Sequence, residues 1–166
     1  RDAQPSSKHN GTTMIRITID DPTILDMLKG IYANKLNATS KGARYSMNSK
    51  KRAFKEAVRL TSNVDGEPAT GDTIIAIYSI TLPRCDWDAP IKALQDSIEP
   101  WIGCRDDRVI RYAWVFLTRP GKETKYKPER PRQVVVDLYN AKDEKEKALA
   151  RAFHLLDWGA KCWDPR

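Results

Sequence analysis

Acidic side chains gather in this chain directly after a segment rich in β-branched and apolar residues. Asp86 and Asp88 are separated by one residue, so their side chains share one face of an extended chain. Lys92 and Asp96 follow at four-residue spacing, which places them one above the other on a helix that begins near Asp88. The spacing therefore predicts carboxylates and one ammonium that project from a strand end and a helix.

A second acidic pair comes one predicted helix later. Asp106 and Asp107 lie just before another apolar segment, so we expect the two acidic pairs to meet at one end of a sheet. Carboxylates that meet repel one another unless a cation lies among them, and hard oxygen ligands of this kind suit Mg²⁺ or Mn²⁺. The alternative is a solvated turn and helix face, held by exposed ion pairs that contribute about 0.3–0.5 kcal/mol each.

The elements that must position these residues follow from the hydrophobic pattern. Apolar and β-branched segments predict strands over residues 14–19, 73–82, 109–117 and 133–139. Helical periodicity and capping signals predict helices over residues 23–31, 49–60, 89–99 and 143–158. Polar, turn-rich segments predict loops over residues 34–45, 63–71 and 118–131. The fold class is a single α/β (α+β) domain over residues 14–166, a small mixed β-sheet with packed helices.

Several details of these elements can be checked. We expect Asp88 to cap the third helix, and Gly159 to end the last one. The apolar stripe predicted for helix 49–60 consists of Ala53, Phe54, Ala57 and Leu60. The apolar face predicted for helix 143–158 consists of Leu149, Ala152, Phe153 and Leu156. Residues 1–13 are polar and are expected to be a disordered leader, a tag remnant or a trimmed start.

The charge balance favours a polyanionic partner. The chain carries a net charge of +7, from 29 Lys and Arg against 22 Asp and Glu. This favours nucleic acid first and an anionic membrane surface second. No apolar run approaches the roughly 18–20 residues that span a bilayer, and the N-terminal segment has no apolar signal-peptide core. The three cysteines form no Cys-x-x-Cys pair and are most simply reduced thiols of an intracellular protein.

Basic side chains outside the acidic cluster are candidates for contact with phosphate groups. The DNA-binding candidates are Lys35, Lys41, Arg44, Lys50, Lys51, Arg52, Arg84, Lys125 and Lys127. Tyr45 is suited to stacking on exposed bases. The alternative is that these residues are ordinary solvated surface side chains.

The ordered motif resembles a known family. Asp86-x-Asp88-x-x-x-Lys92-x-x-x-Asp96, followed by Asp106-Asp107 and a strand from Val109, is similar to the RusA-like Holliday junction resolvases. The resemblance covers about residues 72–117 and extends weakly to the flanks. It departs at Ala89, where members of that family usually carry Asn.

The resemblance implies a homodimeric, Mg²⁺-dependent endodeoxyribonuclease, active also with Mn²⁺ and without a small-molecule cofactor. Such an enzyme resolves four-way DNA junctions by symmetric paired nicks in recombination and repair, in the cytoplasm of a bacterium or of a phage-infected host cell. The resemblance implies that Asp86, Asp88 and Asp107 are catalytic metal ligands and that Lys92 is essential for cleavage, with Asp96 and Asp106 as possible additional acids. Two alternatives remain open: a non-catalytic basic DNA-binding protein on the same fold, or a nuclease that prefers flaps or forks.

Overall fold

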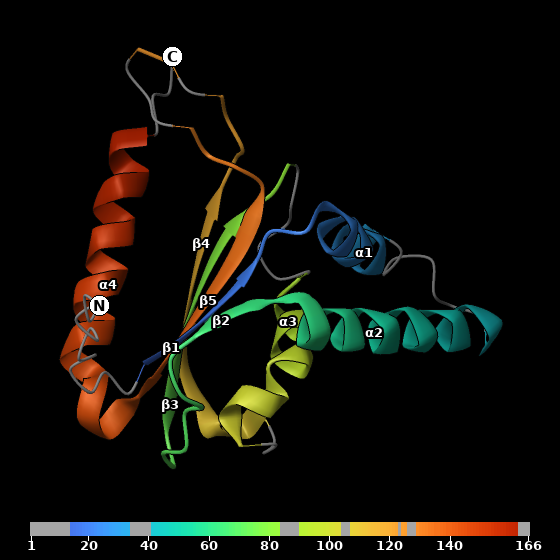
Figure 1. Ribbon diagram of the computed structural model, residues 1–166, viewed down its shortest axis with the longest axis horizontal. Helices are drawn as coiled ribbons and strands as arrows, with labels where there is room; N and C mark the ends of the chain where they lie inside the picture. The colour runs from blue at the N-terminus through green and yellow to red at the C-terminus, as the bar shows by residue number, and fades with distance from the viewer. Residues whose placement is uncertain are drawn as a thin grey trace, which may run out of the picture.

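A mixed sheet forms the centre of the molecule (Figure 1). The computed structural model describes residues 14–33, 41–83, 90–103, 107–122, 124–125 and 129–162. Its strands are β1 (Met14–Ile19), β2 (Asn63–Asp65), β3 (Ile74–Thr81), β4 (Ile110–Thr118) and β5 (Gln133–Asn140). They lie in the order β2-β1-β5-β3-β4, and β3 and β4 pair in parallel whereas the other neighbours are antiparallel. The predicted mixed sheet with packed helices is confirmed.

Helices cover both faces of this sheet. The helices α1 (Pro22–Ala33), α2 (Lys41–Thr61) and α3 (Ile91–Ser97) lie on one face, and α4 (Ala141–Cys162) lies on the other (Figure 1). The sequence of β3 explains why two layers are needed, because nearly every residue of this strand is buried. Ala76 and Tyr78 belong to the core under α1 and α2, whereas Ile75 and Ile77 belong to the core under α4. The strand therefore has no face left for water.

The two cores differ in size and in character. The core under α1, α2 and α3 contains the apolar side of β1 together with Leu28, Phe54 and Leu94, all buried. The core under α4 is small and centres on Ile77, Tyr139 and Ala148. Apolar burial alone therefore holds α4 less firmly than the helices of the opposite face.

A charged cluster supplements the small core under α4. The fully buried Asp137 of β5 accepts hydrogen bonds from Arg16 Nε at 2.6 Å and from Arg16 Nη2 at 3.0 Å. Arg151 of α4 donates from Nε to the same carboxylate at 3.2 Å. The hydrogen bond to Asp137 raises the pKa of Arg16. Burial, with the nearby Asp137 charge, raises the pKa of Tyr139 to about 12. The cluster ties α4 and β1 to the central strand β5.

The helix α2 departs from the sequence prediction in its length and its phase. It begins at Lys41, so the loop expected over residues 34–45 is wrong from residue 41 onward. Its buried side chains are Phe54 and Val58, whereas Ala53 and Leu60 are exposed. Phe54 and Val58 are four residues apart and so lie on the side of the helix that faces the sheet, whereas Leu60 lies on the opposite side.

The helix α4 and the strand β2 also differ from expectation. The helix α4 continues through Gly159 to Cys162, since one glycine inside a helix costs only about 1 kcal/mol. Its buried side chains include Ala148 and Ala152, while Phe153 and Leu156 are exposed, so the predicted apolar face is wrong in part. The short strand β2 replaces part of the predicted loop 63–71. Within the described ranges, no helix combines the length and the apolar character that crossing a membrane requires.

Candidate functional site

The described residues form a frame around the acidic motif. The strand β3 ends at Thr81, and α3 begins at Ile91 after Pro90. Residues 84–89, which include Arg84, Asp86 and Asp88, lie outside the described residues, as does Asp106. The backbone of Asp107 begins the 3₁₀ turn η3 (Asp107–Val109), which leads into β4. The structure thus fixes the elements on either side of the candidate ligands.

Lys92 and Asp96 form the part of the motif that the structure describes in full. Lys92 Nζ lies 3.0 Å from Asp96 Oδ1, and the predicted i, i+4 arrangement on one helix face is confirmed. The two side chains are 60% and 43% exposed, while Ala93 and Leu94 on the other side of α3 are buried. An exposed pair of this kind contributes about 0.5 kcal/mol or less, so packing of α3 does not depend on it.

The expected meeting of both acidic pairs falls on side chains outside the described ones and stays a prediction, but the pairing of the strands limits how they can meet. Because β3 and β4 are parallel, from Ile74 opposite Ile110 to Thr81 opposite Thr118, the end of β3 and the start of β4 lie at opposite ends of this pair. Eight residues of strand separate these ends by roughly 25 Å. A site that uses both acidic segments must therefore be built along the connection between the strands.

That connection runs back along the sheet through α3 and a second 3₁₀ turn, η2 (Glu99–Ile102) (Figure 1). The carbonyl of Trp101 accepts a hydrogen bond from the amide of Ala69 at 2.9 Å, so η2 lies beside the segment that enters β3. The seven residues of α3 span about 10 Å. A shared site for both acidic segments would thus lie along α3, on the face of the sheet that α1 and α2 also cover.

Local chemistry explains why the predicted helix 89–99 becomes two shorter elements. Pro90 occupies the N-cap position, so the prediction that Asp88 caps this helix is wrong. Ser97 donates its hydroxyl to the carbonyl of Leu94 at 2.8 Å near the end of α3. Gly103 ends η2 with a φ of 73°, a left-handed conformation that glycine adopts without strain. An ion pair between Lys55 and Glu99 then ties η2 to α2.

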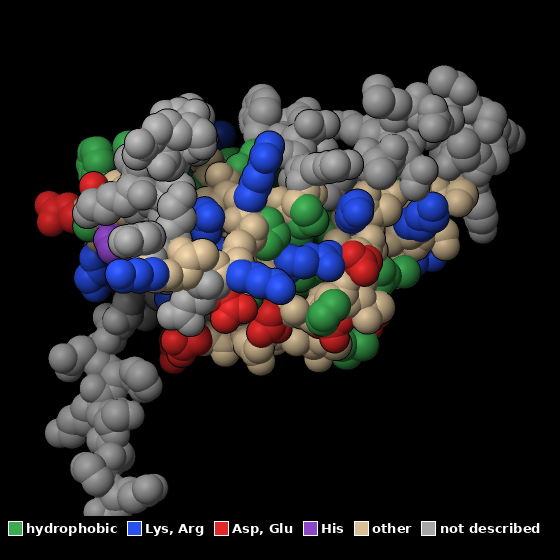
Figure 2. Space-filling view, turned by 90° about the horizontal axis from the view of Figure 1, so that it is seen from above, with side chains coloured by type: hydrophobic (Ala, Val, Ile, Leu, Met, Phe, Trp, Pro, Cys, Tyr) green, Lys and Arg blue, Asp and Glu red, His purple; other side chains and the backbone are tan. Residues whose placement is uncertain are grey.

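The basic candidates divide according to where they lie. Lys50, Lys51 and Arg52 are exposed along α2, and Lys125 is exposed beyond β4. Lys41, Arg44 and Tyr45 belong to the backbone of α2, but their side chains are not among those described, and Lys35 and Lys127 lie outside the described residues. Figure 2 shows Lys and Arg side chains spread across one face of the molecule, with Asp and Glu gathered toward its edge.

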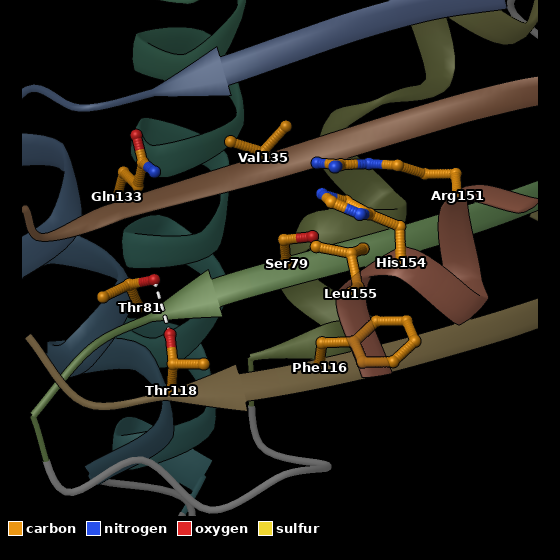
Figure 3. A pocket seen from close by; sticks show the side chains of 9 residues that line it. All are labelled: Ser79, Thr81, Phe116, Thr118, Gln133, Val135, Arg151, His154 and Leu155. Carbon is orange, nitrogen blue, oxygen red and sulfur yellow. Dashed lines mark hydrogen bonds between the residues drawn. The ribbon is translucent and has the colours of Figure 1, made fainter. Parts of the chain in front are cut away.

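A cavity between α4 and the sheet gave no signal in the sequence. Its volume is about 220 Å³, and its polar lining consists of Ser79, Thr81, Thr118, Gln133, Arg151 and His154. Phe116, Val135 and Leu155 form its apolar walls (Figure 3). On each strand the two lining residues are separated by one position, so their side chains share one face of the sheet. The cavity itself depends on where α4 leaves the sheet, which no local pattern encodes.

The side chains of Asp86, Asp88 and Asp107, which the sequence analysis gave as metal ligands, are not among the described ones. Among the described side chains, no three His, Cys, Asp or Glu residues lie close enough together to hold a metal ion. Comparisons with protein-family models, with curated proteins and with solved structures found no match to this chain. The functional argument therefore rests on the motif and on the frame around it.

Proposed function

We propose that this chain is a Mg²⁺-dependent, structure-selective endonuclease that acts on branched DNA, with the four-way junction as its substrate class. The observation that carries the proposal is the position of the Lys92–Asp96 pair. This pair lies on the exposed side of α3, the helix that connects the segment of Asp86 and Asp88 to that of Asp107. The spacing of these residues along the chain supports a common site.

The donor set suits the proposed cation. Asp86, Asp88 and Asp107 offer carboxylate oxygens, which Mg²⁺ prefers among protein ligands. When bound, the cation would lower the pKa of a coordinated water and offset charge on the scissile phosphate. Ala89 cannot offer these carboxylates the side-chain hydrogen bond that an Asn at this position would provide.

Lys92 supplies the positive charge that phosphodiester hydrolysis requires beside the metal. A compact ammonium stabilises the negative charge that develops on the phosphate oxygens during cleavage. The contact of 3.0 Å to Asp96 orients this ammonium, and its exposure leaves room for a phosphate to approach. In this role Asp96 positions Lys92 rather than binding the substrate.

The exposed basic side chains of α2 supply contacts to the DNA backbone. Lys50, Lys51 and Arg52 are exposed on α2, a helix that packs against α3. Contacts of this type bind phosphates without reading base sequence. A dimer with two-fold symmetry would present two such sites to a junction, which has the same symmetry.

A specific observation favours a second function, in which the same fold binds DNA without cleaving it. The pair of Lys92 and Asp96 has the spacing and the exposure of an ordinary surface ion pair. In that function the acids only balance local charge, and the basic side chains bind the DNA backbone. The two functions differ in their dependence on metal.

Cleavage of labelled synthetic DNA tests the proposal. A four-way junction, a linear duplex and a flap are incubated with Mg²⁺ and the wild-type chain, Asp88→Asn, Lys92→Gln or Lys29→Gln. Lys29→Gln is the matched control, because it removes one charge from an exposed position on α1. We expect paired symmetric nicks in the junction from wild type and Lys29→Gln, and none from the other variants or with EDTA.

The other outcomes assign different functions. Metal-independent binding of the junction without any nick would replace the endonuclease with the DNA-binding protein. Metal-dependent cleavage of the flap in preference to the junction would retain the chemistry and change the substrate.

A further inference from the structure

The cavity under α4 arises from the way this helix meets the sheet. Ala148 and Ala152 are small and buried, so they allow close approach to Ile75 and Ile77. Beyond this contact the larger side chains of Arg151, His154 and Leu155 stand between the helix and the sheet. A cavity of about 220 Å³ remains over the final residues of β3 and β4 and the first residues of β5 (Figure 3).

Hydroxyl and amide groups form the floor of this cavity. The hydroxyls of Thr81 and Thr118 hydrogen bond to each other at 2.8 Å, and Gln133 adds an amide beside them. Ser79 Oγ is buried and has no hydrogen-bond partner among the described residues. A buried hydroxyl without a hydrogen-bond partner destabilises the folded state, and an acceptor atom of a bound ligand would supply the missing partner. The floor is therefore suited to a ligand that accepts hydrogen bonds.

The charge around the cavity is positive. Arg151 contacts Asp137 through Nε, but Asp137 also accepts two hydrogen bonds from Arg16. One carboxylate thus contacts two guanidinium groups, and of these two Arg16 also lies near Asp65 on the neighbouring strand, whereas Arg151 faces the cavity. Arg151 and His154 extend from α4 over Ser79 and Val135 (Figure 3), and none of the residues that line the cavity is acidic.

The size and the walls of the cavity limit the ligand further. A water molecule occupies about 30 Å³ in the liquid, so a volume of about 220 Å³ holds the equivalent of about seven waters. This volume is small for a drug-sized ligand. It suffices for one phosphate group on a compact organic body, and Phe116, Val135 and Leu155 provide an apolar wall for that body.

We propose that the cavity between α4 and the sheet binds a small phosphate monoester, with the phosphate held by Arg151, Ser79 and His154. The site lies on the opposite face of the sheet from α3, so it does not depend on the proposed endonuclease activity (Figure 1). The phosphate can come from a free sugar phosphate or from the 5′ end of a DNA strand. These two sources share the chemistry that the cavity recognises.

Isothermal titration calorimetry separates these sources and tests the site. The probes are inorganic phosphate, deoxyribose 5-phosphate and uncharged deoxyribose, together with a short oligonucleotide with and without a 5′-phosphate. The variants are Arg151→Gln and Ser79→Ala, with Lys145→Gln as a control that removes one charge from an exposed position on α4. Amide chemical shifts of Ser79, Thr118 and Gln133 locate the binding.

We expect deoxyribose 5-phosphate to bind at least tenfold more tightly than deoxyribose, with shifts at those three amides. Arg151→Gln should weaken this binding by about tenfold or more, because hydrogen bonds to charged groups are the strong ones. Lys145→Gln should leave the affinity within about twofold, since screening weakens a distant exposed charge. Ser79→Ala should weaken binding severalfold without lowering the stability of the ligand-free chain, since it removes an unpartnered buried hydroxyl.

Preference for the phosphorylated oligonucleotide over the sugar phosphate would identify a DNA end as the source, and the reverse preference would identify a free ester. The proposal is overturned if no phosphate probe binds saturably, or if deoxyribose binds as tightly as its phosphate. It is also overturned if Arg151→Gln, folded as judged by circular dichroism, binds like the wild type, or if Lys145→Gln loses as much affinity.

Discussion

Replacement of the buried Asp137 by Asn tests how α4 is attached to the sheet. Asp137 lies at the centre of β5, is fully buried, and accepts three hydrogen bonds from Arg16 and Arg151. Asn has nearly the same shape but no charge, so the substitution leaves two guanidinium groups beside a neutral amide. The change therefore isolates the contribution of the charge.

The expected loss in the free energy of unfolding follows from the burial of the three partners. Removal of one partner from a buried ion pair typically costs 3–5 kcal/mol. Arg16 and Arg151 are 37% and 27% exposed, so water partly replaces the lost carboxylate. We expect a loss of about 2–3 kcal/mol, which corresponds to a fall in Tm of about 4–12 °C for a chain of this size.

Urea denaturation followed by circular dichroism measures this loss. Arg16→Met should cost more than Arg151→Met, because Arg16 donates two of the three hydrogen bonds. The triple replacement of Asp137 by Leu and of both arginines by Met should cost less than Asp137→Asn alone, since it leaves no buried charge unpaired. A loss below about 0.5 kcal/mol for Asp137→Asn would refute this account of the cluster.

Three further predictions concern other parts of the molecule. Gly71→Ala places a Cβ 2.2 Å from Asn140 Oδ1, which accepts a hydrogen bond from the Lys142 amide, so we expect a loss of about 1 kcal/mol in thermal unfolding. The control Gly30→Ala meets nothing within 4 Å in α1 and should stabilise by about 0.5–1 kcal/mol, and equal effects of the two would contradict this account. Because burial raises the pKa of Tyr139 from 10.0 to about 12, the native state keeps a proton that the unfolded state loses. The stability from this phenol is therefore complete below pH 10 and disappears between about pH 10 and 12. Tyr139→Phe should flatten the loss over that range by up to about 2–3 kcal/mol, whereas exposed Tyr112→Phe should not. Lys92→Gln should change the free energy of unfolding by less than about 0.5 kcal/mol, because its pair with Asp96 is exposed, yet reduce junction cleavage roughly 100-fold or more. A large loss of stability would show instead that Lys92 is structural.

The sequence predicted the central strands because β3 and β5 are buried over most of their length and β1 alternates between apolar and polar residues. The strands β1, β3 and β5 lie within one or two residues of their predicted bounds. The start of α2 was missed because Gly42, Ser46 and Asn48 are typical of loops and caps, while the tertiary structure extends the helix through them. The strand β2 is entirely exposed and has no apolar pattern, so only its pairing with β1 identifies it.

The candidate site was predictable only where the signal is local. The i, i+4 spacing was sufficient to place Lys92 beside Asp96. The relation between the two acidic segments depends on the parallel pairing of β3 and β4, which is a property of the whole sheet. The cavity under α4 was not predictable, because four separate elements line it and Arg151 of α4 contacts Asp137 of β5, which lies 14 residues earlier in the sequence.

Titration of the DNA-free chain with Mn²⁺ tests most directly whether both acidic segments serve one metal site. Calorimetry on wild type, Asp88→Asn and Asp107→Asn should show a site that either substitution abolishes. The matched control Asp26→Asn, which removes an exposed carboxylate on α1, should retain it. Absence of Mn²⁺ binding in the wild type, or binding that survives Asp107→Asn unchanged, would contradict a site shared along α3.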